Sequence, residues 1–229
     1  MKNVILLLLS VCGMLACTHT PKWELVWEDN FDGAEPDTTI WSRIPRGKPD
    51  WQNTQSFDDR CYEMRNGLLI LKGIVNDNTE ADAAQYLTGG LWTKDKHAFH
   101  RGRIEVRARL HGARGAWPAI WTLPYEIDKY VWPMGGEVDI MERLNNDSIA
   151  YQTVHSHYTY TLGITENPKS HSTGPIYPDR YNVYAVEMYP DSLSFYINDM
   201  HTDRAFKVST PDKKGVPPTP CVSSRVPEH

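Results

Sequence analysis

The sequence predicts an all-β protein, an antiparallel β-sandwich, and three observations support this fold class. Apolar and polar residues alternate with a period of two in several short segments, as in strands with one buried face. Turn-forming residues separate these segments, with 16 prolines and 15 glycines among 229 residues. No window shows a convincing run of apolar residues at the 3.6-residue spacing of a helix. We therefore expect one domain of two packed sheets, with no internal repeat and no interdomain linker.

The first predicted strands form a hairpin. The range Tyr62–Leu71 is interrupted by Asn66–Gly67, and both of these residues tolerate positive φ, which predicts a tight turn between two strands. Further along, Gly102–Leu110 alternates charged and apolar residues, which predicts a strand with one face in the core. Its basic residues are then expected on the outer face: Arg103, Arg107 and Arg109.

The last predicted strands lie near the C-terminus. Tyr181–Met188 and Ser192–Ile197 flank Pro190–Asp191, which predicts two strands joined by a turn. Two polar ranges with weak patterning, Pro45–Asp59 and Asn76–Ala84, are expected to be surface loops.

The N-terminus has the pattern of a secretion signal. Lys2 precedes the apolar run Val4–Leu9, which is too short for the roughly 20 residues that span a membrane. The ending Leu15–Ala16–Cys17 resembles a bacterial lipoprotein signal, so we expect residues 1–16 to be the signal and Cys17 the lipidated residue, with 17–22 as anchor and linker. This predicts an outer-membrane lipoprotein of a bacterial cell envelope, facing the periplasm or the cell surface. The alternative is an ordinary secretory signal with an incidental cysteine.

Composition excludes several classes of function. The net charge is -5 and no block of Lys or Arg occurs, so neither nucleic acid nor an anionic membrane surface is an expected partner. Eight Trp and twelve Tyr are a high aromatic content, which suits stacking on sugar faces as well as filling a β-rich core. The spacing of Cys61 and Cys221 indicates no metal site and no thiol nucleophile.

Three carboxylates lie within six residues: Glu137, Asp139 and Glu142. On a regular strand the first two share a face, whereas Glu142 would point to the other side. A β-bulge at Ile140–Met141 would put all three acids on one face, leaving Val138 and one residue of the bulged pair to enter the core.

Such a group of acids suits the cleavage of a glycosidic bond. A retaining mechanism needs an ionised and a protonated carboxyl group about 5 to 5.5 Å apart. The charges of Glu137 and Asp139 are expected to raise the pKa of Glu142, which makes Glu142 the acid/base and Glu137 the nucleophile. Asp139 would hold the orientation of the nucleophile. On residue type alone, a solvated acidic face or a cation site is the alternative.

Further motifs accompany the acids in a fixed order. They are Leu25–Phe31, Thr88–Thr93, Arg101–Ala108, Gly115–Trp121 and, after the acids, Thr153–His155. This series resembles glycoside hydrolase family 16, the laminarinases, lichenases, agarases and their relatives, from Trp23 to about Met200. The resemblance implies a concanavalin-like jelly roll, a catalytic domain over residues 23–208, and the three acids in the roles given above on the concave face of the inner sheet.

Other site residues are expected around the acids. Trp117 and Trp121 are four positions apart, so on a strand both would face one way, towards the cleaved sugars that the resemblance implies. Trp132 lies in the loop that leads into the acidic motif, and His155 could hydrogen-bond a carboxylate or a sugar hydroxyl. The alternatives are core-filling tryptophans and a two-histidine metal site of His155 with His157, which would share its face.

The end of the chain departs from the family. Residues 209–229 are rich in proline, lack strand character and read like a frameshift followed by an early stop, so the sandwich is expected to lack its last strands. No cofactor is required by the expected chemistry and no metal ligand is assigned. Family members often bind a structural calcium through a closing Asp; this Asp is missing, so the calcium site is doubtful.

The leading interpretation is a retaining endo-β-glycanase that hydrolyses β-1,3 or mixed β-1,3/1,4-glucan of the laminarin or lichenan type. An endo-β-1,4-galactosidase acting on poly-N-acetyllactosamine of mucin or keratan glycans is an alternative. A non-catalytic carbohydrate-binding jelly roll and an inactive truncated remnant are others, although Glu137 and Glu142 argue against a pure lectin. The expected partner is a β-linked polysaccharide, and the expected state is a monomer.

Overall fold

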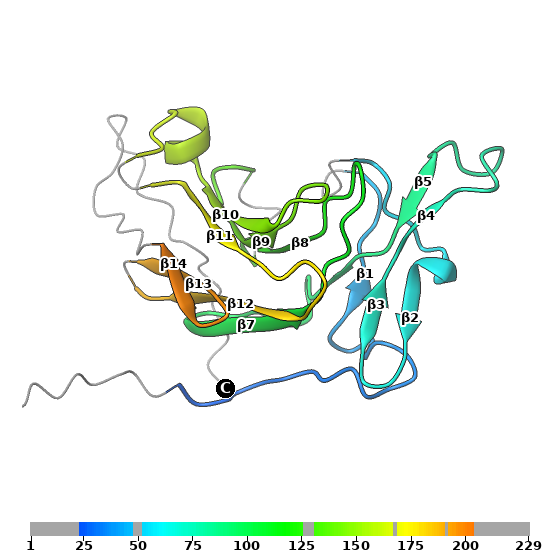
Figure 1. The fold of residues 1–229 in the computed structure, drawn as a ribbon, viewed down its shortest axis with the longest axis horizontal. Coiled ribbons are helices and arrows are strands. Elements are labelled where there is room, and N and C mark those ends of the chain that lie inside the picture. The colour runs from blue at the N-terminus through cyan, green and yellow to red at the C-terminus, as the bar shows by residue number, and fades with distance from the viewer. Residues whose placement is uncertain (1–22, 48–51, 126–130, 167–168, 191, 204–229) are drawn as a thin grey trace, which may run out of the picture.

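The computed structural model describes residues 23–47, 52–125, 131–166, 169–190 and 192–203, and its centre is a sandwich of two four-stranded antiparallel sheets (Figure 1). Sheet I has the order β11-β10-β9-β8, and sheet II has the order β14-β13-β12-β7. Three two-stranded pairs, β1-β6, β2-β3 and β4-β5, complete the described sheets. The predicted all-β sandwich is confirmed.

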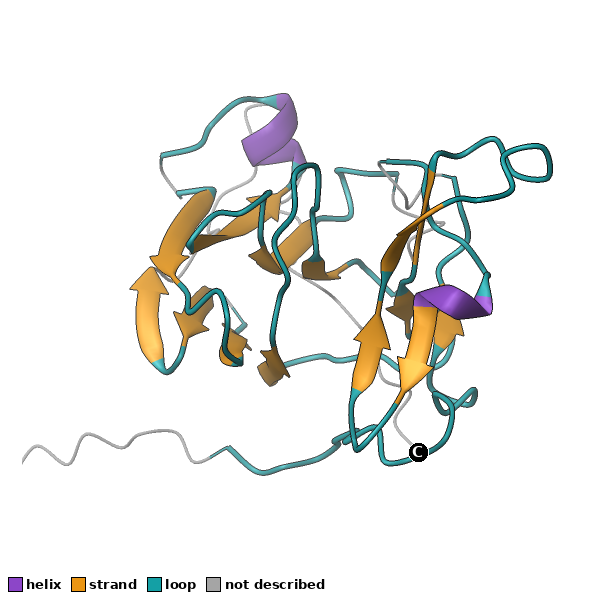
Figure 2. Cartoon of the chain, turned by 45° about the vertical axis from the view of Figure 1, so that its right-hand side comes forward, coloured by secondary structure: helices purple, strands orange, loops and turns teal. Residues whose placement is uncertain are grey.

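The strand bounds are β1 Ser42–Arg43, β2 Tyr62–Met64, β3 Leu69–Leu71, β4 Gly73–Val75, β5 Tyr86–Thr88, β6 Leu91–Trp92, β7 Gly102–Ala108, β8 Ala119–Thr122, β9 Glu137–Glu142, β10 Ile149–His155, β11 His171–Pro175, β12 Asn182–Met188, β13 Leu193–Ile197 and β14 Met200–Asp203. Two short helical turns, η1 Asp59–Cys61 and η2 His157–Thr161, are the only helices of the described ranges (Figure 2). Across the part of the chain that is described, no helix is both long and apolar enough to cross a membrane.

The core lies between the two sheets. Alternate residues of each strand enter it, as the period of two predicts. Sheet I contributes Val138 and Val154, and sheet II contributes Tyr184, Val186 and Phe195, all of them at most 5% exposed. The opposite face of each sheet therefore points away from the core.

Both predicted hairpins are confirmed. Asn66 and Gly67 have φ of 55° and 68° between β2 and β3, where the positive values demand residues that tolerate them. β12 and β13 pair in an antiparallel register on either side of the predicted turn. The predicted outer face of β7 is correct for Arg107, whose guanidinium stacks on the Tyr181 ring at 4.0 Å.

Arg103 differs from that prediction in its exposure. Its side chain is only 16% exposed, because it forms an ion pair with Glu187 on the adjacent strand β12. Arg109, just beyond β7, lies 5.7 Å from the Tyr181 ring centroid. The basic residues of this strand are thus on the expected face, although one of them belongs to a partly buried polar network.

The bulge predicted in β9 is present. Asp139 pairs with Thr153 and Glu142 pairs with Tyr151, so that Ile140 and Met141 together oppose one residue of β10. That residue is Gln152, which is buried and donates from Nε2 to the Ile140 carbonyl at 3.0 Å. The expectation that only one residue of the bulged pair enters the core is wrong. Both are buried, because a bulged pair occupies a single position in the alternation and both side chains turn to the same face.

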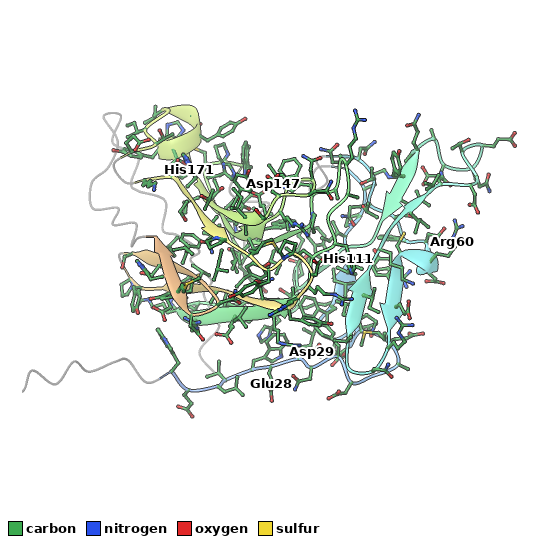
Figure 3. The ribbon with its side chains drawn as sticks, viewed as in Figure 1. Glu28, Asp29, Arg60, His111, Asp147 and His171 are labelled. Atoms are coloured by element: carbon green, nitrogen blue, oxygen red, sulfur yellow. The ribbon has the colours of Figure 1, made fainter. Side chains whose placement is uncertain are left out.

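The N-terminal segment runs along the outer side of sheet II, where Trp23 donates to Glu187 of β12. Glu28 and Asp29 are on this segment, and Arg60 is on η1 at the far end of the molecule (Figure 3). Asp29 accepts a hydrogen bond from the Trp41 indole at 2.7 Å, which ties the segment to the residue just before β1. The predicted signal over residues 1–16, Cys17, residues 17–22 and the tail 209–229 with Cys221 lie outside the described residues.

Replacing Phe195 with alanine is expected to lower the free energy of unfolding by about 3–5 kcal/mol. Phe195 is 1% exposed in the core between the sheets, so truncation removes apolar contacts and leaves a cavity. The measurement is urea denaturation followed by tryptophan fluorescence. The matched control is Phe57→Ala, the same chemical change at a side chain that is 60% exposed, for which a change within about 0.5 kcal/mol is expected. Equal effects at the two positions would contradict the placement of the core.

Candidate active site

The three acids of β9 share one face of sheet I. Val138 and Val154, which are Cα partners, are buried in the core, so the alternate residues of both strands face away from it. His155 is the Cα partner of Glu137, and Trp121 of β8 is the Cα partner of Asp139. Directly opposed residues of an antiparallel pair lie on the same face. The outer face of sheet I therefore brings together the acids, an imidazole and an indole.

Each acid has its own nitrogen-bearing ring. Trp132 Nε1 donates to Glu137 Oε2 at 2.5 Å, and Trp117 Nε1 donates to Glu142 Oε1 at 2.7 Å. His155 Nε2 lies 3.2 Å from Asp139 Oδ2, so the two form an ion pair when the imidazole is protonated. The rings fix where the carboxylates point, and the predicted contact of His155 with a carboxylate is confirmed.

Two expectations about the surroundings are wrong. Trp117 does not share a strand with Trp121, since β8 begins at Ala119, and the intervening Pro118 cannot donate to a sheet ladder. Trp117 instead reaches Glu142 from the loop before β8 and is 43% exposed. His157 does not continue the face of His155, because β10 ends at His155 and η2 begins at His157.

The physical reason for the end of β10 is a capping box. The Ser156 hydroxyl accepts from the Thr159 amide at 3.1 Å, and the Thr159 hydroxyl accepts from the Ser156 amide at 2.9 Å. This reciprocal pair starts a helical turn at the point where the strand would otherwise continue. The turn removes His157 from the face of the acids, so the two-histidine alternative loses its geometric basis.

Sequence reasoning missed Tyr160. It lies on η2, its ring centroid is 4.5 Å from that of Trp132 in an edge-on arrangement, and it is 54% exposed. It also lies 6.0 Å from the His155 ring centroid. Tyr160 thus backs the two rings that contact Glu137 and Asp139. The Ser-x-x-Thr spacing after the strand is the signal that could have indicated a turn at this point.

The electrostatics of the acids are dominated by burial. Burial raises the pKa of Glu137 to about 7, and the neighbouring charge of Asp139 adds to this while the Trp132 donor opposes it. Burial also raises the pKa of Asp139, against the effect of His155. The two carboxyls hydrogen-bond each other and titrate as a pair.

The pKa of Glu142 is raised, as the sequence predicted, but the main cause differs from the predicted one. Burial raises the pKa of Glu142, the Trp117 hydrogen bond opposes it, and repulsion from Glu137 is a smaller contribution. The expectation that crowding of the acids sets the roles is therefore wrong in its cause. Asp139 in turn raises the pKa of His155, which keeps a positive charge beside the acids to higher pH.

A cation site is the alternative use of these acids. Within the described ranges, no group of three or more His, Cys, Asp or Glu side chains is arranged to hold a metal ion. We assign no metal ligand in this site. The doubt about a structural calcium, which rests on the missing closing Asp, stays a prediction.

The chain is similar to one family model and to several known proteins. The model of an XgeA-like GH16 catalytic domain matches residues 75–186. A beta-glucanase of Rhodothermus marinus is 33% identical over 201 residues, which cover 82% of this chain and 68% of the relative. The chain belongs to glycoside hydrolase family 16. A keratan-sulfate endo-1,4-beta-galactosidase of Sphingobacterium multivorum is 32% identical over 186 residues, 79% of this chain, but this GH16 chain spans only 42% of that relative.

Solved structures of the family have the same fold. The laminarinase of Rhodothermus marinus superimposes with a TM-score of 0.71 at 29% identity, over 82% of this chain and 76% of that one. SCLam, described as a non-specific endo-beta-1,3(4)-glucanase of family GH16, superimposes with a TM-score of 0.70 at 26% identity, over 84% and 73% of the two chains. The jelly roll expected from the resemblance is confirmed for this GH16 chain.

Replacing Trp132 with phenylalanine is expected to reduce kcat/KM by roughly 10- to 100-fold, which corresponds to the loss of one hydrogen bond to a charged group. The indole donor stabilises the ionised form of Glu137, so its removal raises the pKa of Glu137 further and moves the acidic limb of the pH profile to higher pH. The measurement is the pH dependence of kcat/KM. Trp41→Phe removes a similar indole–carboxylate bond, to Asp29, away from the acids and is the matched control. An unmoved acidic limb would show that Trp132 does not tune Glu137.

Proposed function

We propose that the chain is a retaining endo-β-glycanase that hydrolyses β-1,3 or mixed β-1,3/1,4-glucan. The observation that carries the proposal is the bulged strand β9, which holds Glu137, Asp139 and Glu142 on one outward face, each beside its own ring nitrogen. A solvated acidic face has no need of half-buried carboxyls with raised pKa values. Membership of family 16 supports a catalytic role for these three acids.

In the proposed mechanism Glu137 attacks the anomeric carbon while Glu142 donates its proton to the leaving glycosidic oxygen. The covalent glycosyl ester on Glu137 is then hydrolysed by water, from which Glu142 takes a proton. Asp139 hydrogen-bonds Glu137 and, with His155, takes up the proton that Glu137 must lose before it can attack. The raised pKa of Glu142 allows it to carry its proton near neutral pH.

The similar proteins include a beta-glucanase and a keratan-sulfate galactosidase, so a keratan-type glycan is the alternative to glucan as substrate. The beta-glucanase of Rhodothermus marinus is covered over more of its length than the keratan-sulfate endo-1,4-beta-galactosidase, 68% against 42%. Relatives named as glucan endo-1,3-beta-glucosidases, from Niallia circulans and Cryptopygus antarcticus, are 28% and 27% identical. These names favour glucan as the substrate, with keratan or mucin glycans as the second candidate.

Product analysis tests the proposal. The chain is incubated with laminarin, mixed-linkage glucan, agarose and keratan sulfate, and oligosaccharides are separated while NMR follows the first anomer formed. We expect oligosaccharides from laminarin or mixed-linkage glucan, with the β configuration retained. Cleavage of keratan sulfate alone would establish the galactosidase alternative. A first product of α configuration would contradict the retaining mechanism.

We also propose that the chain is a monomeric lipoprotein of the bacterial envelope, anchored through Cys17. The Leu-Ala-Cys sequence after the apolar run supports this. Labelled palmitate should be incorporated into the chain and lost in Cys17→Ala, which should appear in the soluble fraction. Labelling of the variant at the original level would contradict the anchor.

A further inference from the structure

The outer face of sheet II carries a polar and aromatic hollow that the chemistry of the acids does not use. Arg103 of β7 is the Cα partner of Glu187 of β12, and their strand neighbours Ile104 and Val186 pack in the core. The two charged residues therefore point away from the core. The acids lie on the outer face of sheet I, so both packed sheets, about 10 Å apart, separate the hollow from them.

The floor of the hollow is a fixed network around Glu187. Its Oε1 accepts from Trp23 Nε1 at 3.1 Å and from Arg103 Nη1 at 3.2 Å. Its Oε2 accepts from the hydroxyls of Tyr189 at 2.9 Å and Tyr196 at 2.8 Å. Glu187 is 8% exposed, and these four donors balance its charge and hold the three aromatic side chains in place. The surface is thus preorganised and does not have to be ordered by a ligand.

The size of the hollow suits a sugar unit. Its volume is about 320 Å³, at the lower end of the range of ~300–1,000 Å³ for small-molecule sites. Trp23 is 39% exposed, and its ring is tilted against that of Tyr189 at 6.0 Å, so an indole surface stays open to solvent. The lining residues are Trp23, Arg103, Glu105, Glu187, Tyr189, Tyr196 and Asp199.

The charges select the class of ligand. One arginine faces three acids, Glu105, Glu187 and Asp199, so a sulfated or otherwise anionic glycan would be repelled. A cationic ligand would find the face of Tyr196 already occupied, since the Arg103 guanidinium lies 4.9 Å from the ring centroid of Tyr196. An exposed indole and two exposed rim carboxylates remain. These groups suit the C–H face and the hydroxyl groups of a neutral sugar.

We propose that this hollow is a second, non-catalytic binding site for the neutral polysaccharide that the active site cleaves. The identity of the ligand rests on the proposed function, whereas the site itself rests on the network of Glu187. Because the hollow and the acids are on opposite outer faces, a chain bound at the hollow leaves the catalytic face open. Binding at the hollow keeps polymer at a high effective concentration near the acids without taking part in the reaction.

Affinity electrophoresis tests the site, with the full chain run through gels that contain laminarin, mixed-linkage glucan or keratan sulfate. Glu142→Gln serves as the background in every sample, so that no gel is degraded. Trp23→Ala removes the indole surface. Asp199→Gly removes a rim carboxylate whose side chain is 87% exposed, and glycine tolerates the positive φ of 61° at this turn. Tyr177→Ala, at an aromatic side chain that is 57% exposed and does not line the hollow, is the control.

We expect retention by the neutral glucan that the wild type cleaves to weaken roughly tenfold in Trp23→Ala, as for the loss of an aromatic anchor, and less in Asp199→Gly. With Glu142 restored, both variants should cleave short oligosaccharides at the wild-type rate and the polymer more slowly. Wild-type retention of both variants would overturn the proposal. If Trp23→Ala does not fold, unchanged retention and unchanged polymer cleavage of Asp199→Gly would overturn the proposal.

The same experiments distinguish failure of the proposed function from failure of the second binding site. If the chain cleaves none of the glycans, retention in each gel is still measured directly, and a loss in Trp23→Ala with any neutral glycan supports the site. If the chain cleaves laminarin but the variants are retained like the control, the site is refuted and the proposed function stands. Retention by keratan sulfate alone would refute the neutral ligand, since the charges of the hollow exclude anionic chains.

Discussion

Replacing Glu137 with alanine is expected to lower the rate of polysaccharide cleavage by at least roughly 10⁴-fold, because without the nucleophile no glycosyl ester can form. Glu137 stands beside Asp139 and accepts from Trp132, and no other carboxyl of β9 has this pair of neighbours. The space left by the side chain admits a small anion. Formate should therefore restore part of the activity, and the product of this single displacement should have the α configuration. The measurement is the initial rate with and without formate, with NMR of the anomer.

The control for this substitution is Glu80→Ala, at an exposed acid in the loop before β5, which should keep the wild-type rate. Folding is checked by thermal unfolding at pH 8. Burial raises the pKa of Glu137 to about 7, so its ionisation above pH 7 opposes folding, and the variant should melt at or above the wild-type temperature. Wild-type turnover in Glu137→Ala, or rescue during which no α-configured formate product forms, would refute its role as nucleophile.

Replacing Glu142 with glutamine is expected to lower kcat on polysaccharide by about 10²- to 10⁴-fold with little change in KM. The amide oxygen can still accept from Trp117 Nε1, so the geometry of binding is preserved, but the amide cannot donate a proton to the leaving oxygen. Aryl glycosides whose leaving groups need no protonation should lose far less activity. The measurement is kcat on laminarin and on such a glycoside across a range of pH.

The pH dependence of activity is an independent test of the role of Glu142. In the wild type, activity falls as pH rises through the raised pKa of Glu142, because the proton to be donated is lost. Glu142→Gln has no such proton, so this basic limb should disappear while the acidic limb set by Glu137 and Asp139 stays. An equal loss on both kinds of substrate, with the basic limb intact, would exclude Glu142 as the acid/base.

A single strand can hold an acid and a base if the two side chains have different partners. The two glutamates share a face and both are half-buried, so desolvation raises both pKa values. The two glutamates differ in their partners. Glu137 lies beside the Asp139 carboxyl, which in turn contacts His155. Glu142 accepts a hydrogen bond from the Trp117 indole. A proton can leave Glu137 for its neighbour, while Glu142 has no carboxyl beside it on β9 to receive one. The bulge makes this possible, because it brings the third acid to the same face.

The sequence by itself determined the fold class, the two hairpins, the bulge and the face on which the acids lie. All of these follow from local rules: a period of two assigns each residue to a face, Asn66–Gly67 permits positive φ, and one extra residue re-phases a strand. The burial of both Ile140 and Met141 was the detail that these rules did not supply.

Only the tertiary structure decided which groups meet across the chain. Trp117 reaches Glu142 from a loop, and Tyr160 backs Trp132 from a helical turn that follows another strand. Trp23 meets Glu187 across 164 positions of sequence, which no local pattern encodes. Periodicity says which way a side chain points, but its partner, its desolvation and its pKa depend on how sheets and loops pack around it. For this reason burial, and not the spacing of the acids, is the main cause of their raised pKa values.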